Sequence, residues 1–364
     1  MSIIYFDNAA SAKPCDEAVD VFNAVIRENY ANSMSLHKGG IEAERIITSS
    51  REALLALLPK NGDLIFTSGA TESNNSALLG TAELRRESGR IVSTTIEHPS
   101  VARVLDKLSE RGFEVTRLSP GNCRGDFEDY IAENSQGAFM VSVTAVCGET
   151  GFKIDTARVY SEIKRRFPGC TVHTDGSQGF LKVPLDGDLI SLSAHKIGGI
   201  AGAGGLFVKN GVRLAARLFG GNQQKGLRPG TLPTALIAAF AKAAETSRPI
   251  DGALQKRLAD GLNRLDGIKI NSRDNVNNIL NFSCGVKSEV MLHFLAEKGI
   301  YVSSGSACSK GKKSEILPSY GISGKALDSA IRVSFGRQNT AGEVDVFLER
   351  LEAGMKRFGG RPWN

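Results

Sequence analysis

The residues best suited to chemistry lie around Lys196. This lysine ends the motif Ser193-Ala194-His195-Lys196, which follows the apolar run 188–192 and precedes the glycine-rich stretch 198–205. A lysine after a buried strand is costly unless it is exposed, paired or chemically used. Its amine can form a Schiff base with a carbonyl compound. Taken alone, such a lysine is more often a solvated residue at the edge of a sheet.

Three further polar groups follow expected strands. Ser68-Gly69-Ala70-Thr71 opens a helix, so its backbone amides and the Thr71 hydroxyl suit a phosphate. Asp175 is placed to hold a protonated heterocycle, and His98 ends another strand. Helix capping explains Thr71 and Asp175 more simply, and a polar loop explains His98. In open α/β sheets, however, ligands bind at the carboxyl ends of the strands. An amine, a phosphate cradle and a carboxylate at one edge together indicate pyridoxal phosphate.

The hydrophobic pattern predicts the elements that carry these groups. Between residues 64 and 193, apolar strands alternate with amphipathic helices, which predicts an α/β domain with a mostly parallel central sheet and helices on both faces. The later residues predict a smaller α+β domain. We expect the large domain to span 13–249 and the small domain to combine 1–12 with 250–364. The expected strands are 3–7, 64–66, 91–95, 113–118, 138–143, 171–175, 189–193, 279–282 and 331–334, and the expected helices include 71–86, 99–111, 126–133, 157–167, 234–246, 251–265, 289–298 and 342–358.

Composition excludes several classes of protein. The chain has 364 residues, 41% hydrophobic and 23% charged, and its net charge of +6 comes from 45 basic and 39 acidic residues that are interspersed. Direct nucleic-acid binding is therefore not expected, because such charge is usually concentrated on one face. We see neither a signal peptide nor a membrane span. The six cysteines lack the short spacings of zinc sites, so we expect reduced thiols, a cytoplasmic location and no metal.

Motifs along nearly the whole chain resemble those of the cysteine desulfurases. In chain order they are Phe6-Asp7-Asn8-Ala9-Ala10, Phe66 to Asn75, Glu97-His98-Pro99, His173 to Gln178, Ser193 to Lys196, Arg228-Pro229-Gly230-Thr231 and Ser303-Ser304-Gly305-Ser306-Ala307-Cys308. The last motif resembles the long-loop group of that family. The resemblance implies a pyridoxal phosphate-dependent transferase of fold type I, in the class V aminotransferase group, that works as a homodimer.

The resemblance also implies a role for each matching residue. Lys196 would hold the cofactor covalently, Asp175 would pair with the pyridine nitrogen, His98 would stack on the ring, and Gln178 would bind the ring hydroxyl. The phosphate would be held by Ala70, Thr71, Ser193 and His195, and by Thr231 of the other subunit. Arg332 would bind the substrate carboxylate, since a guanidinium pairs with it bidentately, and Asn32 would help to shape that pocket.

Cys308 would be the nucleophile that takes the sulfur of L-cysteine, leaving L-alanine and a persulfide. Such a thiol must deprotonate and reach both substrate and acceptor. The nearby glycines and the lysines 310, 312 and 313 fit both needs. The simpler alternative is an inert loop cysteine. The acceptor would be an iron–sulfur cluster scaffold or a tRNA- or thiamine-thiolation protein.

Two stretches depart from the family pattern. Val146-Cys147-Gly148-Glu149 stands where Val-Asn-Asn-Glu is usual, and Gly199-Ile200-Ala201-Gly202 replaces Gly-Pro-Lys-Gly. Cys147 can be a small substitute, a second thiol near the substrate, or a packing residue. These changes bear on substrate affinity and rate more than on reaction class.

Two other functions compete with cysteine desulfuration. A selenocysteine lyase, or a C–S lyase that releases sulfur without protein transfer, would use the same cofactor residues and would retain activity without Cys308. A non-catalytic binding protein would keep the fold alone. The joint presence of Lys196, Asp175, Gln178, His98 and Cys308 argues against the second alternative.

Overall fold

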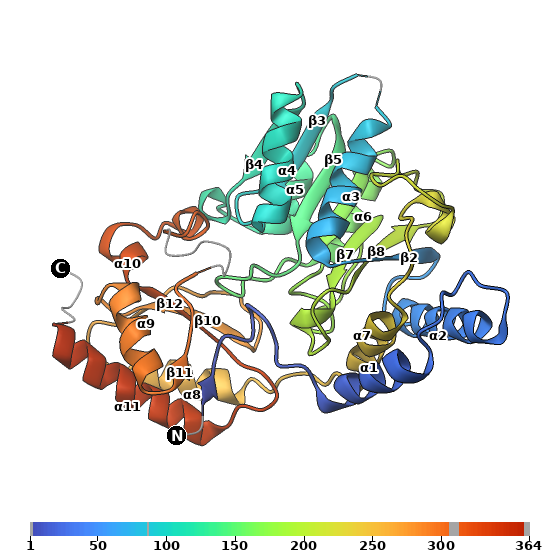
Figure 1. Ribbon diagram of the computed structural model, residues 1–364. Coiled ribbons are helices and arrows are strands. Elements are labelled where there is room, and N and C mark those ends of the chain that lie inside the picture. Colours follow the sequence, from blue (N-terminus) through green and yellow to red (C-terminus); the bar gives the residue numbers. More distant parts are fainter. Residues whose placement is uncertain (1–2, 86, 306–312, 360–364) are drawn as a thin grey trace.

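The structure, a computed structural model, describes residues 3–85, 87–305 and 313–359. Its centre is a seven-stranded sheet in the order β2-β8-β7-β6-β5-β3-β4 (Figure 1). Only β8 runs against its neighbours, and the other strands are parallel to one another. The predicted mostly parallel α/β sheet is therefore confirmed. The strands are β2 (Gly62–Thr67), β3 (Arg90–Thr94), β4 (Glu114–Leu118), β5 (Ala138–Thr144), β6 (Thr171–Asp175), β7 (Leu189–Ser193) and β8 (Gly204–Lys209).

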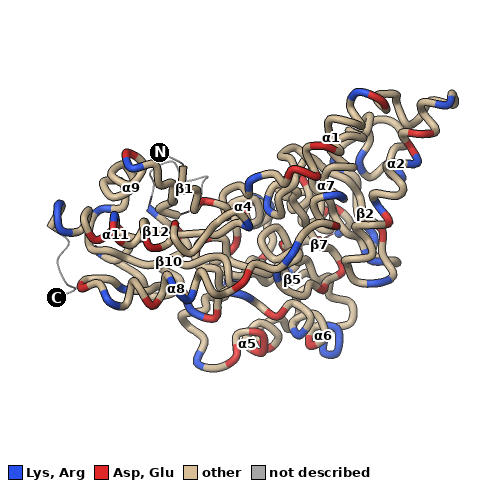
Figure 2. Tube along the Cα trace, turned by 90° about the horizontal axis from the view of Figure 1, so that it is seen from below, with Lys and Arg blue, Asp and Glu red and all other residues tan. Residues whose placement is uncertain are grey.

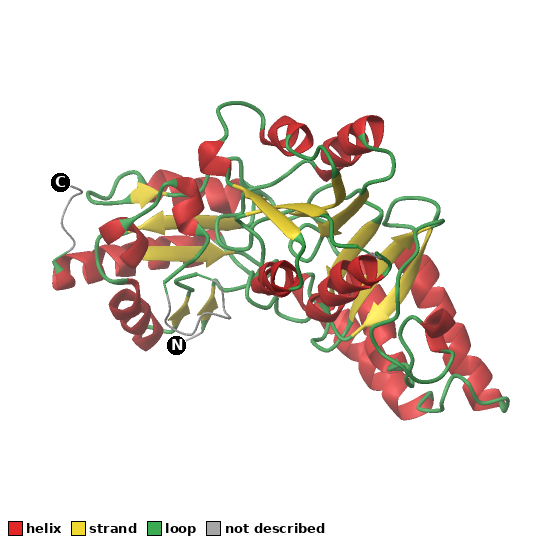
Figure 3. Ribbon diagram, turned by 90° about the horizontal axis from the view of Figure 1, so that it is seen from above, coloured by secondary structure: helices red, strands yellow, loops and turns green. Residues whose placement is uncertain are grey.

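Both faces of this sheet are covered, because successive side chains of a strand point to opposite faces. In β3, Ile91 packs with α3 (Ala70–Glu83) and α4 (Pro99–Glu110). Its neighbour Val92 packs with α5 (Phe127–Glu133) and α6 (Thr156–Arg166) on the other face. The β7 and β8 part of that second face is covered by α1 (Asp16–Glu28), α2 (Lys38–Leu55) and α7 (Thr234–Thr246). Figure 3 shows helices on both sides of the strands.

A second hydrophobic core surrounds a three-stranded antiparallel sheet in the order β12-β10-β9. Ile4 and Phe6 belong to this core although they lie at the other end of the chain, because β1 (Ile4–Tyr5) pairs in parallel with β11 (Ile300–Tyr301). The predicted strand 3–7 is thus shorter than expected, and the domain boundaries at 13 and 249 stay a prediction. The remaining elements are β9 (Lys269–Ile270), β10 (Ile279–Ser283), β12 (Ala330–Ser334), α8 (Ala253–Leu262), α9 (Ser288–Glu297), α10 (Gly324–Asp328) and α11 (Ala341–Phe358).

Charge is spread over the described surface, with basic and acidic residues interspersed (Figure 2). No helix in the described ranges is long and apolar enough to span a bilayer. Within the same ranges, no group of three or more His, Cys, Asp or Glu side chains is arranged to hold a metal ion.

Candidate active site

The topology brings the sequence-predicted groups to one edge of the large sheet. Strands β2 and β7 flank β8, so Thr67 and Ser193 both lie opposite Gly204 in the register. Asp175 ends β6, the next strand. The carboxyl ends of the parallel strands therefore present Ser68, Asp175 and Ser193 at the same edge, as the sequence predicts.

Lys196 ends the short 3-10 helix η2 (Ala194–Lys196) that follows β7. Its Nζ donates hydrogen bonds to Ala9 O at 2.6 Å and Ala10 O at 2.9 Å. Gln178 Nε2 donates to the same Ala9 oxygen at 2.6 Å. The N-terminal segment thus fixes both side chains at the edge of the sheet.

Asp175 is almost completely buried and holds several hydrogen bonds. Its Oδ1 accepts from the backbone N–H of Ser177 at 2.9 Å and from the Ser177 hydroxyl. Its Oδ2 accepts from Asn74 Nδ2 at 2.8 Å, and the same nitrogen lies 2.9 Å from Ser100 Oγ. These bonds fix the orientation of the carboxylate.

His98 caps α4 and shares Ser100 with Asn74. Its Nδ1 lies 2.8 Å from Ser100 Oγ, which links His98 through Asn74 to Asp175. The imidazole is exposed in this single chain. The protein around it still lowers its pKa by desolvation, Lys196 adds to that effect, and Asp175 opposes it. The ring is therefore neutral at pH 7, as a group that stacks on a heterocycle can be.

The loop between β2 and α3 is the segment that the sequence predicts as an anion cradle. Gly69 has a φ of +152°, and the N-terminus of α3 has no side-chain cap, so its N–H groups have no side-chain acceptor there. A Cβ atom on Gly204 would lie 2.5 Å from Gly69 Cα, and one on Gly69 would lie 3.9 Å from Ser193 Oγ. The loop therefore packs directly on β8 and beside Ser193. Thr71, on the first turn of α3, is exposed at the cradle.

His195 lies beside this cradle. Its Nδ1 is 3.3 Å from Ser11 Oγ. Burial lowers the pKa of His195 to about 4, and the nearby charge of Lys196 adds to the effect. The imidazole is neutral at pH 7, so it contributes a hydrogen bond rather than a charge.

Arg332 approaches from β12 of the second core and is 2% exposed. Its Nη2 donates to Asp7 Oδ1 at 2.6 Å and its Nη1 to Gly148 O at 2.9 Å. Within the part of the chain that the structure describes, Nε has no hydrogen-bond partner. Asp7 lies two residues before Ala9, which binds Lys196. The N-terminal segment thus joins the predicted substrate arginine to the predicted cofactor lysine.

Some predicted site residues do not lie at the site that is formed by their own chain. Asn32 and Thr231 are exposed, Asn32 on the α1–α2 loop and Thr231 on the loop after β8. In Figure 1 the α1–α2 loop and β12 lie at opposite ends of the molecule, so Asn32 is far from Arg332 of its own chain. Cys308 lies in 306–312, outside the described residues, so the nucleophile and the long-loop assignment stay predictions.

The structure distinguishes the two unusual residues after Val146. Cys147 is fully buried in the core between the large sheet and α5 and α6, and burial raises the pKa of its thiol. That environment favours the packing role among the alternatives left open by the sequence. Gly148 faces the site instead, because its carbonyl binds Arg332 and a Cβ there would lie 3.6 Å from the Gln178 side chain.

Sequence reasoning missed Asn74, Ser100 and Asp7. Asn74 and Ser100 lie one helical turn or less from Thr71 and His98, so helical spacing from those residues was the available signal. Asp7 carries no such signal, because its contact with Arg332 joins the two ends of the chain.

These residues fit pyridoxal phosphate. The uncapped helix start beside Ser193 suits a phosphate, the buried and hydrogen-bonded Asp175 suits a protonated ring nitrogen, and the Lys196 amine lies at the same edge. Asn74 Oδ1 is buried here and has no hydrogen-bond partner among the described residues, as expected for a polar atom that a bound group completes.

Residues 4–347 match the family model described as aminotransferase class-V. The chain belongs to this family, whose members use pyridoxal phosphate. Its relatives are cysteine desulfurases and their homologues. It is 36% identical to the NifS/IcsS protein homolog of Lactobacillus delbrueckii subsp. bulgaricus, over 98% of both chains. It is 35% identical to the cysteine desulfurase IscS of Vibrio cholerae, over 88% of this chain and 84% of that one.

Solved structures agree with this assignment. A NifS-like protein superposes with a TM-score of 0.88 at 29% identity, covering 98% of this chain and all of the other. A structure described as SspA in complex with cysteine superposes with a TM-score of 0.80 at 28% identity, covering 91% and 98%. The fold is thus the fold-type I architecture that the sequence predicts.

Proposed function

We propose that the protein is a cysteine desulfurase that converts L-cysteine to L-alanine and passes the sulfur to an acceptor protein. The observation that carries the proposal is the bridge made by residues 7–10, which binds Arg332 through Asp7 and Lys196 through Ala9 and Ala10. This bridge puts a carboxylate-binding cation beside a reactive amine. An amino acid substrate needs both. The solved SspA structure with cysteine supports the same substrate.

The chain's residues divide the work as follows. Lys196 supplies the amine that holds the cofactor and, once released by substrate, moves the α-proton of cysteine. Asp175 would hold a proton on the pyridine nitrogen of the bound cofactor, and Asn74 fixes the orientation of the Asp175 carboxylate. When bound, pyridoxal phosphate supplies the electron-withdrawing ring that makes removal of the α-proton and cleavage of the carbon–sulfur bond feasible.

Other residues position the cofactor and the substrate. With the cofactor bound, His98 would lie against its ring. Gln178 Nε2 donates one hydrogen to Ala9 O and would offer its second to the ring hydroxyl. The amides of α3, the Ala70 and Thr71 turn, Ser193 and His195 hold the phosphate. Arg332 exchanges Asp7 for the substrate carboxylate, which leaves the thiol side of the substrate open to Cys308.

The proposal includes a homodimer in which Thr231 completes the phosphate site of the partner and Asn32 its substrate pocket. Large apolar side chains exposed on the loops that carry these residues support it, since such surfaces are usually covered in an assembly. Tyr30 is 83% exposed, Leu36 95% and Phe219 89%. The acceptor is an iron–sulfur scaffold or a tRNA- or thiamine-thiolation protein.

A cytoplasmic location is also part of the proposal. The described cysteines support it, because Cys15, Cys123, Cys147, Cys170 and Cys284 are all free thiols.

The experiment that tests this function is an assay of alanine formed from L-cysteine by protein loaded with the cofactor. The wild-type protein is expected to release alanine, and Lys196→Ala to release none. Lys256→Ala is a matched control, because Lys256 forms a surface pair with Asp260 on α8. Wild-type protein that forms no alanine, or forms pyruvate instead, would refute the proposal.

A further inference from the structure

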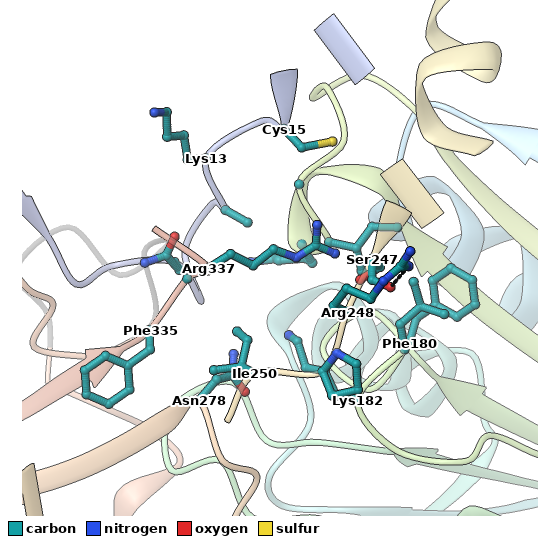
Figure 4. A pocket seen from close by; sticks show the side chains of 18 of the residues that line it. Lys13, Cys15, Phe180, Lys182, Ser247, Arg248, Ile250, Asn278, Phe335 and Arg337 are labelled. Atoms are coloured by element: carbon teal, nitrogen blue, oxygen red, sulfur yellow. Dashed lines mark hydrogen bonds between the residues drawn. The ribbon is translucent and has the colours of Figure 1, made fainter. Parts of the chain in front are cut away.

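One cavity of the described structure is lined by Lys196 and by segments that do not carry the proposed phosphate and ring residues. Its volume is about 530 Å³, which is the size of a small-molecule site. Six segments far apart in the sequence line it, together with Asn8 and Lys153 (Figure 4). The six are 12–17, 180–183, 196–198, 247–250, 275–278 and 335–338. Lys196 also lines it, but Asp175, His98, Thr71 and Ser193 do not. The cavity is therefore distinct from the proposed phosphate and ring site.

The lining is strongly basic. Six cationic side chains line the cavity against two acidic ones, Asp16 and Glu17. In the described part of the chain, Lys13, Lys153, Lys182 and Arg337 form no ion pair with a carboxylate. Figure 4 shows Arg337 and Arg248 both reaching into this space. Cations gathered without counter-charges favour the binding of an anion. The six are Lys13, Lys153, Lys182, Lys196, Arg248 and Arg337.

Lys182 is the most enclosed of these cations that the proposed reaction does not use. Its Nζ donates to Gln178 Oε1 at 3.1 Å, a neutral partner. Burial lowers the pKa of Lys182 to about 7, and the charge of Lys196 adds to the effect. An ammonium enclosed without a carboxylate is costly, so a bound anion would provide the missing counter-charge.

The same lysine is connected to the active site. Gln178 accepts from Lys182 and donates to Ala9 O, which also accepts from Lys196 Nζ. The apolar side chains of Phe180, Ile250 and Phe335 complete the walls around the cations. A ligand held at Lys182 is therefore joined to Lys196 by a continuous series of hydrogen bonds.

We propose that this cavity is an effector site for a small polyanion, a molecule with at least two carboxylate or phosphate groups, held by Lys153, Lys182 and Arg337. The binding of the anion does not depend on the proposed function. Only the effect of the bound anion on Lys196 rests on the proposed function. Carboxylates and phosphates are both recognised by charge-assisted hydrogen bonds from such side chains.

Calorimetric titration of the cofactor-loaded protein with citrate and, separately, with pyrophosphate tests the site. Loading with pyridoxal phosphate fills the phosphate cradle, so that neither probe can bind there. Saturable binding of at least one probe is expected, and the probe that binds tells carboxylate from phosphate ligands. Arg337→Ala and Lys153→Ala are each expected to weaken binding by about tenfold or more, the equivalent of one lost charge-assisted hydrogen bond.

Lys256→Ala is the matched control, since it removes a surface lysine outside the cavity and should leave the affinity unchanged. Circular dichroism of each variant confirms that it is folded. The proposal is overturned if neither probe binds saturably, or if both cavity variants bind as the wild type does. Because the titration needs no turnover, its outcome is independent of whether alanine forms from cysteine.

Discussion

Asp7 Oδ1 lies 2.6 Å from Arg332 Nη2, so an acidic residue of the N-terminal segment forms an ion pair with Arg332. The sequence predicts that this same guanidinium binds the substrate carboxylate. The arginine is 2% exposed, and its other contact is a backbone carbonyl at Gly148. A buried ion pair of this kind holds the guanidinium in place, although removing both charges from water has a desolvation cost. A second carboxylate can replace Asp7 as the partner of the guanidinium. The pair therefore fixes the orientation of Arg332 in this structure.

The first prediction follows from this pair. Arg332→Lys keeps the charge but loses the planar pair of donors, so the KM for L-cysteine should rise by about tenfold or more, with a smaller change in kcat. Steady-state alanine formation measures both constants. Arg350→Lys is the control, because Arg350 lies on α11 and forms a surface pair with Glu349. An unchanged KM in Arg332→Lys would remove Arg332 from the substrate site.

The second prediction concerns the orientation of Asp175. Asn74→Ala removes the donor to Asp175 Oδ2 and the contact with Ser100, so cofactor affinity and activity should each fall by about tenfold. Asn75→Ala is a matched control on the next position of α3, where the side chain binds the Thr71 carbonyl. Release of cofactor during dialysis measures the first effect. Equal retention by the two variants would contradict the role given to Asn74.

The third prediction concerns the close approach of β8 to the anion cradle. Gly204→Ala places a Cβ 2.5 Å from Gly69 Cα and 2.6 Å from Leu192 O, so the cradle must shift. We expect cofactor affinity to fall and the free energy of unfolding to drop by about 1–3 kcal/mol. Gly125→Ala is the control, because a Cβ there meets no atom within 4 Å. Urea denaturation and cofactor titration measure the two effects, and normal cofactor binding by Gly204→Ala would contradict the cradle.

The fourth prediction is a pH dependence of stability at Glu97. Burial raises the pKa of this carboxyl from 4.5 to about 8, with Asp175 adding to the effect, and its Oε2 has no partner. Between those values the unfolded chain is ionised while the folded protein keeps the proton, so the free energy of unfolding falls as the pH rises.

The glutamine of Glu97→Gln cannot ionise, so this substitution removes the fall in the free energy of unfolding at high pH. The variant should be more stable than the wild type at pH 8, by about 1–2 kcal/mol, with little gain at pH 5. Urea denaturation at both pH values measures the difference, and Glu133→Gln on the surface is the control. A gain that is the same at both values would show that ionisation of Glu97 is not its cause.

Local patterns predicted the site better than they predicted its connections. Lys196, Asp175 and the 68–71 turn each follow an apolar strand, and the parallel topology alone brings strand ends together. The Asp7–Arg332 contact and the pairing of β1 with β11 join residues about 300 positions apart, and no periodicity in the sequence encodes them. The sequence pattern did not predict the basic cavity for the same reason, since its cations come from separate segments.

Single departures from the family pattern were also hard to interpret before the fold was known. The sequence left three roles open for Cys147, and only the fold shows that its side chain packs in the core. The neighbouring Gly148 faces Gln178 and Arg332, although a glycine offers no functional group to notice. Which of two adjacent residues faces a site depends on the orientation of the backbone there, and composition does not specify it.

The central claim is that Lys196 and Cys308 act in sequence on L-cysteine. Its most direct test is mass spectrometry of the cofactor-loaded protein after treatment with L-cysteine, together with measurement of the alanine released. We predict that the wild type gains sulfur on Cys308 and releases alanine, whereas Lys196→Ala does neither. Alanine released by Lys196→Ala, or wild-type protein that releases alanine with no sulfur on Cys308, would contradict the account.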